Sequence, residues 1–156
     1  MESNEAVQGA KRMRNAINTE ALGAHWKDSG VDMLAPVSAL QVQQAFAAAG
    51  SIACADVIAL YGILGGMWEM DSEYWRLWSL DEIIEANDAP SDAGILFSDY
   101  CIDCYHFRLK YVDETVSEVW YEGYDGGPPV RVAASLSDFL DLYMRNPDAV
   151  LNAPRR

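Results

Sequence analysis

Residues 94–111, GILFSDYCIDCYHFRLKY, decide the fold of this chain. They open with the apolar run Ile95-Leu96-Phe97 and end in regular alternation, with an aromatic or apolar side chain at every second position from Tyr105 to Tyr111. This period of two predicts a half-buried strand of an antiparallel sheet that is covered on one side. Ser98-Asp99 is able to turn the chain, so we expect two strands joined within 98–101.

Helices are predicted both before and after this segment of the sequence. Ser38 and Gln41 form a capping box for a helix over 38–49, and Ser51 is expected to cap a second helix that stops in the glycine-rich segment 62–66. The remaining expected elements are a strand at 74–78, a short helix opened by Ser79 with Glu82, strands at 116–123 and 130–134, and a last helix capped by Ser135 or Ser137. With short connections, this order predicts an α+β fold: a twisted antiparallel sheet packed by N-terminal helices and a C-terminal helix.

The length and composition predict a single domain. We expect a loosely ordered segment at 1–24, in which a helix over 6–22 can form, a domain at 25–151 and a tail at 152–156. The sequence has no basic head followed by an apolar core and no apolar run long enough to span a bilayer, so we expect no membrane association. Three cysteines are an odd number and are interpreted as free thiols in the cytoplasm.

The negative charge is concentrated in the middle of the chain. The net charge is −13, and residues 69–125 hold fifteen Asp and Glu against three Lys and Arg. Such a surface repels nucleic acid and anionic membranes and attracts basic proteins, although high solubility alone would also explain it.

No pattern in the sequence indicates catalysis. Cys101, Cys104 and His106 are three plausible metal ligands, with Cys54 or His25 as a fourth. In a strand, however, the two thiols would lie about 10 Å apart on opposite faces, so we interpret them as small side chains that fill the sheet. Only a sharp turn at Cys101 would restore a metal or redox site. The segment 62–66 lacks the Lys-Ser/Thr of a phosphate loop, and no nucleophile–base pattern is present. We expect no catalytic residue, metal or cofactor.

Trp68 is the best candidate for an exposed aromatic anchor, because acidic residues follow it directly. An equally good interpretation is a residue that covers the edge of the sheet. The candidate partner-binding residues are Trp68, Glu69, Asp71, Glu73, Asp99, Asp113, Glu114, Glu118, Glu122 and Asp125.

The order of motifs over about 25–151 resembles the SUKH superfamily, which includes bacterial immunity proteins and fungal cell-wall regulators. The motifs are Trp26, Leu34-Ala35-Pro36, Phe46 to Gly50, Leu60 to Gly66, Trp78 to Ile84, Ile95 to Tyr100, Val119-Trp120 and Val132 to Leu140. The chain departs from the family at Ser51-Ile52, where Leu-Pro is usual, and at Leu64, where Asn is usual. The resemblance implies an antiparallel sheet packed by helices and, for many bacterial members, neutralisation of a cognate toxin, often a nuclease. It implies no catalytic residues.

The sequence therefore predicts a non-catalytic, acidic binding protein: an immunity protein whose partner is a basic toxin domain. Two alternatives stay open. One is a regulatory or scaffold module on the same fold, and the other is a metalloprotein or enzyme that uses Cys101, Cys104 and His106. We expect the protein to be a monomer or a weak dimer.

Overall fold

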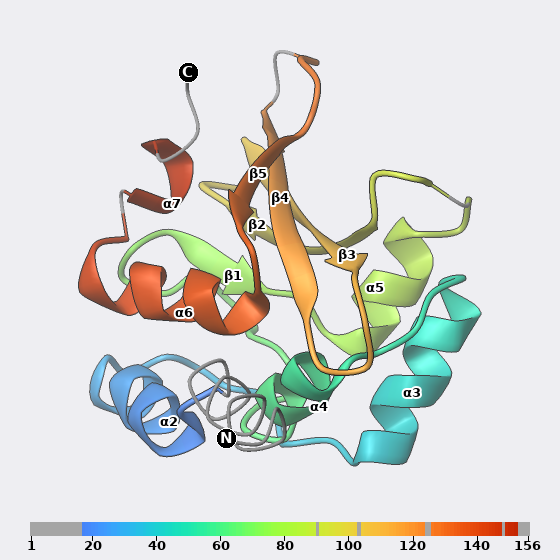
Figure 1. Ribbon diagram of the computed structural model, residues 1–156. Helices are drawn as coiled ribbons and strands as arrows, with labels where there is room; N and C mark the ends of the chain where they lie inside the picture. Colours follow the sequence, from blue (N-terminus) through green and yellow to red (C-terminus); the bar gives the residue numbers. More distant parts are fainter. Residues whose placement is uncertain (1–16, 90, 103, 124–125, 148, 153–156) are drawn as a thin grey trace, which may run out of the picture.

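The computed structural model describes residues 17–89, 91–102, 104–123, 126–147 and 149–152 of the 156-residue chain. The described strands form one antiparallel sheet in which spatial order follows chain order, as Figure 1 shows. The strands are β1 Trp75–Leu77, β2 Ile95–Tyr100, β3 Tyr105–Tyr111, β4 Ser117–Gly123 and β5 Val130–Ala133. This meander is the antiparallel sheet that the short connections predict.

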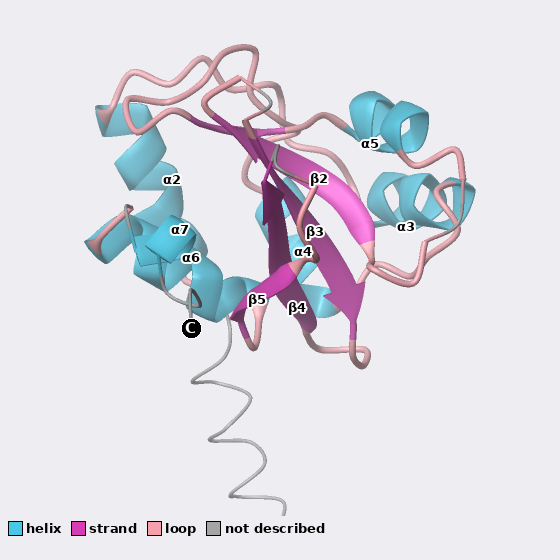
Figure 2. Cartoon of the chain, turned by 90° about the horizontal axis from the view of Figure 1, so that it is seen from above, coloured by secondary structure: helices cyan, strands magenta, loops and turns pink. Residues whose placement is uncertain are grey.

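The order of helices and strands is that of an α+β fold. Seen from above, the helices stand to the left and to the right of the sheet (Figure 2). Helices α2 and α6 lie on one side, and α3 and α5 on the other. Their bounds are α2 Thr19–Asp28, α3 Ala39–Ala48, α4 Ala55–Tyr61, α5 Leu80–Ala86, α6 Leu136–Arg145 and α7 Ala149–Asn152. The predicted α+β class with helices before and after the sheet is confirmed.

Local capping chemistry starts α3, α5 and α6 where the sequence predicts. Ser38 and Gln41 make both hydrogen bonds of a capping box at α3, and Ser79 and Glu82 make both at α5. Ser135, not Ser137, caps α6 by accepting a hydrogen bond from the Asp138 backbone N–H. Each cap satisfies N–H groups that have no partner within the helix.

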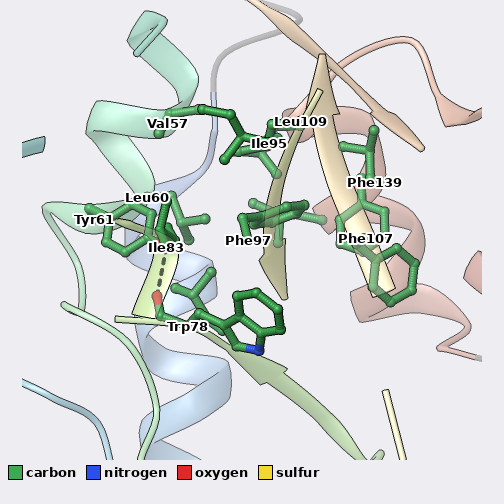
Figure 3. Close-up of a cluster of buried hydrophobic side chains, with 14 of the residues drawn as sticks. Val57, Leu60, Tyr61, Trp78, Ile83, Ile95, Phe97, Phe107, Leu109 and Phe139 are labelled. Atoms are coloured by element: carbon green, nitrogen blue, oxygen red, sulfur yellow. Dashed lines mark hydrogen bonds between the residues drawn. The ribbon is translucent and has the colours of Figure 1, made fainter. Parts of the chain in front are cut away.

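The core lies between one face of the sheet and the helices (Figure 3). Phe97, Phe107 and Leu109 from the sheet meet Leu60 of α4 and Phe139 of α6, and all are buried. The rings of Phe107 and Phe139 lie 5.2 Å apart in an edge-to-face arrangement. Nearby, the Tyr61 hydroxyl donates to the backbone carbonyl of Trp78 at 2.7 Å, which satisfies the only polar atom of a fully buried tyrosine side chain.

One prediction about a helix start is wrong. Ser51 does not cap α4: the N-cap is Cys54, which makes no side-chain capping bond. The expected domain start at residue 25 falls inside α2, where Leu22 and Trp26 are both completely buried. Packing of these two side chains, one turn apart, fixes the helix against the core although the segment lacks a longer apolar pattern. Most of the helix expected over 6–22 and most of the expected tail lie outside the described residues.

The turn between β2 and β3 is also not where the sequence predicts it. Ser98 and Asp99 belong to β2, and the chain reverses after Tyr100, which pairs with Tyr105. Cys101 and Ile102 both have positive φ, at 53° and 51°. Two successive left-handed residues suit a tight hairpin turn, but neither is the Gly or Asn that normally marks one. The sequence therefore carries no turn signal at the correct place.

Candidate binding site

The structure separates the predicted partner-binding residues into three places. Glu69, Asp71 and Asp99 line one pocket beside β1, and Trp68 and Glu73 belong to the segment that precedes β1. The other described candidates are Glu118 and Glu122 in β4, and Asp113 and Glu114 in the β3–β4 turn. Asp125 lies outside the described residues.

The acidic residues of β4 are neutralised within the sheet. Glu118 accepts a hydrogen bond from Arg131 at 3.0 Å, and Glu122 accepts one from Arg108 at 3.0 Å. The Lys110 ammonium lies 5.3 Å from the centre of the Trp120 ring. This open face of the sheet therefore carries paired charges and not the excess of negative charge that the sequence predicts for it.

The β3–β4 turn uses one of its two carboxylates to hold its own shape. Asp113 accepts hydrogen bonds from the backbone N–H groups of Thr115 and Val116, at 2.8 and 3.0 Å. The backbone carbonyl of Glu114 accepts a hydrogen bond from Ala55 at the start of α4. The turn is thus anchored to the helical layer, while the Glu114 side chain stays exposed.

A pocket of about 480 Å³ opens beside β1, and we call it the edge pocket. Its lining residues are Glu69, Met70, Asp71, Ser72, Tyr74, Arg76, Asp99 and Ile102. They come from the segment that precedes β1, from β1 and β2, and from the β2–β3 turn. The pocket therefore brings together two parts of the chain that are about thirty positions apart in sequence.

Asp71 is the most buried carboxylate of the segment before β1. It is 7 % exposed, and its Oδ1 accepts hydrogen bonds from the backbone N–H groups of Glu73 and Trp75 at 2.9 and 3.1 Å. Its Oδ2 is buried and has no hydrogen-bond partner among the described residues. Burial raises the pKa of this carboxyl, and the two backbone hydrogen bonds oppose the rise. Asp71 is therefore a lining group with unused acceptor capacity, not the exposed surface acid that the sequence predicts.

Arg76 links the pocket to helix α5. Its guanidinium makes two hydrogen bonds to Glu82, the shorter at 2.6 Å, and lies 3.4 Å from Oδ1 of Asp99. Asp99 is also buried, and it accepts a hydrogen bond from Trp78 Nε1 at 2.6 Å. Burial acts to raise the pKa of Glu82, but hydrogen bonds from Arg76 and Ser79 outweigh it and leave that pKa lowered. The positive charge of Arg76 is thus already matched by two carboxylates.

Three large side chains are exposed at this end of the molecule. Trp68 is 67 % exposed, Tyr74 56 % and Ile102 72 %. Tyr74 has a φ of 65°, and its carbonyl accepts a hydrogen bond from the Cys101 backbone N–H at 2.8 Å. Tyr74, Cys101 and Ile102 are the non-glycine residues with positive φ among those that the structure describes. Such backbone conformations cost about 1 kcal/mol or more each and often occur at functional sites.

The turn also changes the argument about the cysteines. Cys101 and Cys104 stand at the two ends of a tight turn and not on opposite faces of one strand, so the geometric reason for excluding a shared site was wrong. Neither of them forms a disulfide, and the buried Cys54 forms none either. Within the described part of the chain, no group of three His, Cys, Asp or Glu side chains is placed to hold a metal ion.

Sequence reasoning finds the acidic residues of the edge pocket but misses its other walls. Arg76 could have been predicted from the sequence. It is one of only three basic residues in 69–125, so an ion pair with neighbouring carboxylates was to be expected. Tyr74 and Ile102 carried no such signal, since their place in the pocket depends on the left-handed backbone at each of them.

No described helix is long and apolar enough to cross a membrane. No protein-family model matches the chain, and none of the curated proteins matches it in sequence.

Proposed function

We propose that this chain is a non-catalytic binding protein of the SUKH type, and that it acts as an immunity protein in the cytoplasm by neutralising a cognate toxin with a basic surface. The observation that carries the proposal is the exposure of Trp68, Glu69 and Glu73 in the segment before β1 that also lines the edge pocket. Neither glutamate is paired with a cation among the described residues. An aromatic anchor with unpaired charges around it is a common arrangement of protein-binding sites.

The charge distribution supports a basic partner. Glu118 and Glu122 are paired with arginines, so the unpaired negative charge among the described residues of the middle segment lies elsewhere. It lies at the edge pocket, in the β3–β4 turn, and on Asp81, Glu85, Asp88 and Asp92 in and after α5. Nucleases are basic where they hold phosphate, so an acidic surface could cover that site and speed association. The order of sequence motifs and the meander sheet with its closing helix agree with the arrangement that the SUKH resemblance implies.

The test is a titration of the purified chain against toxin domains encoded beside its gene, repeated with Glu69→Lys and Glu114→Lys. The two residues are exposed glutamates, one on the edge pocket and one in the β3–β4 turn, so each substitution makes the same charge change in a different acidic place. We expect Glu69→Lys to weaken binding and Glu114→Lys to leave it nearly unchanged, with an association rate that falls as salt is added.

Three outcomes would contradict this proposal. The first is the absence of binding to any neighbouring toxin, and the second is binding that neither substitution changes. The third is an isolated gene with no toxin beside it, which would favour the regulatory or scaffold module. Metal analysis of the purified protein, with Cys104→Ser as its comparison, tests the metalloprotein alternative, and a stoichiometric metal would support that alternative.

A further inference from the structure

We infer that the edge pocket is the seat of an arginine side chain presented by the protein partner. This inference rests on the proposed function, because it names the group of the basic partner that enters the binding site. The pocket, of about 480 Å³, has carboxylates, one aromatic ring and apolar side chains on its walls. Each of these three classes of wall has a counterpart in the arginine side chain.

The carboxylates define the charge of the occupant. Asp99 and Arg76 interact with each other, and Arg76 also binds Glu82, so these groups balance one another. Glu69 and Asp71, also on the pocket wall, form no salt bridge among the described residues. An occupant that supplies a positive charge would offset this local excess, whereas an anion would be repelled.

Asp71 points to an occupant that donates hydrogen bonds. Its Oδ2 is a buried acceptor without a partner in the described chain, and leaving a buried carboxylate oxygen unsatisfied is unfavourable. The side chain cannot turn away to find water without losing the two backbone hydrogen bonds that its Oδ1 accepts. A guanidinium, with five N–H donors in a flat fork, can serve Asp71 and Glu69 together.

The remaining walls favour arginine over lysine. Tyr74 lines the pocket and is 56 % exposed, so an aromatic ring is available on its wall. A guanidinium stacks on aromatic faces and is more weakly hydrated than an ammonium. Met70 and Ile102 offer apolar contact for the methylene stem of the same side chain.

The direct test uses a small probe and the full chain. Amide ¹H–¹⁵N spectra are recorded while N-acetyl-arginine amide is added, and again with N-acetyl-citrulline amide, which has nearly the same shape but no charge. We expect saturable shifts for residues 68–76 and 99–102 with the arginine compound and none with the citrulline compound. Equal binding of both compounds, or no saturable shift with either, would overturn the inference.

Variants locate the effect. Glu69→Gln removes one exposed charge, so we expect it to lower the affinity for the arginine probe about two- to fivefold. Asp71→Asn should lower the same affinity about tenfold or more, because the substitution removes a buried charged acceptor. Glu114→Gln, at the far end of β3, is the matched control and should leave binding unchanged. An equal loss with Glu114→Gln would mean that the probe follows overall charge and would contradict a specific pocket.

Glu69→Gln keeps the test decisive if Asp71→Asn disturbs the loop, because Glu69 is exposed and makes no side-chain hydrogen bond in the described structure. The failure of the pocket and the failure of the proposed function give different results. Arginine amide in the pocket without toxin binding would contradict the function alone. Toxin binding that is unaffected by Glu69→Gln, with no probe shifts, would contradict the pocket alone.

Discussion

The carboxylate of Asp56, in the first turn of α4, accepts a hydrogen bond from the backbone N–H of Ser137, in the first turn of α6. One side chain thereby satisfies an unpaired N–H of a neighbouring helix and joins two helices that are about eighty positions apart. Asp56 is 4 % exposed, and its Oδ2 has no hydrogen-bond partner among the described residues. Burial raises the pKa of Asp56 to about 6, with smaller contributions from the charges of Asp138 and Asp113.

This carboxyl should make stability fall as the pH rises. The folded state holds the proton up to about pH 6, whereas the unfolded chain releases it near the ordinary value of 3.8. The unfolding free energy contributed by Asp56 therefore declines between about pH 4 and pH 6 and then stays constant. Asp56→Asn keeps an acceptor for Ser137 and removes the buried charge, so we expect it to stabilise the protein by about 1–3 kcal/mol at pH 7.

Urea unfolding at pH 7 and pH 4 checks this expectation. The gain from Asp56→Asn should shrink at pH 4, where the carboxyl of the folded protein is already protonated. Asp141→Asn is the control, because Asp141 is an exposed acid on α6 whose charge is not among those that raise the pKa of Asp56. A loss of stability with Asp56→Asn that is equal at the two pH values would show that burial of the charge is not costly here.

Arg76 should be the most important cation for stability in the described chain. Arg76→Gln leaves the carboxylates of Asp99 and Glu82 without their guanidinium, and Asp99 is buried. Breaking a largely buried ion pair from one side is expected to cost about 2–4 kcal/mol. The measurement is the free energy of unfolding in guanidinium chloride and in urea.

Arg131→Gln provides the comparison for that measurement. Arg131 binds Glu118 at a similar distance, but its side chain is 55 % exposed, so its loss should cost less than about 1 kcal/mol. Similar losses for the two variants would mean that solvent screens Arg76 as well as it screens Arg131.

Gly94 should tolerate no side chain. Its φ is 101°, and a Cβ there would lie 2.5 Å from the backbone carbonyl oxygen of Leu109 in β3. Gly94→Ala must therefore move backbone of the sheet and should destabilise the fold by about 3 kcal/mol or more. Gly30→Ala is the matched control, since Gly30 also has a positive φ but open space around it, and it should cost about 1 kcal/mol. Thermal unfolding of the two variants separates the contact from the backbone conformation.

The cysteines should differ in reactivity in the folded protein. Cys54 is completely buried, burial raises its pKa, and its sulfur accepts a hydrogen bond from the Ser117 hydroxyl. Cys101 is exposed. In native conditions a thiol reagent should modify Cys101 promptly and Cys54 only after unfolding. Peptide mapping of the labelled protein identifies the sites, and rapid native labelling of Cys54 would show that the core opens at its helix start.

The sequence predicts the helix starts and the strand β3 better than the turns and the contacts between distant residues. Ser38 with Gln41 and Ser79 with Glu82 cap helices through contacts three residues apart, so the local sequence is sufficient to find them. The alternation that ends at Tyr111 also predicts β3, because an apolar side chain at every second position identifies the buried face of a strand.

Features that depend on distant contacts are predicted less well. Asp99 looks like a turn residue in the sequence, but Trp78 and Arg76 hold it within β2, and the turn moves to Cys101 and Ile102. The charges of Glu118 and Glu122 are cancelled by arginines on neighbouring strands, which no local pattern reveals. The acidic composition of the site is thus predictable, whereas its walls and its net charge are not.

The outer edge of β1 limits the ways in which a partner can bind. The backbone carbonyls of Trp75 and Leu77 accept hydrogen bonds from Asp71 and Met67, and the Trp75 N–H donates to the Asp71 side chain. The segment before β1 thus occupies the edge where a foreign strand would otherwise add to the sheet. A partner at this end must engage side chains and cannot extend the sheet. The same arrangement protects this edge from pairing with the sheet of another copy, so one loop contributes both to recognition and to resistance to aggregation at β1.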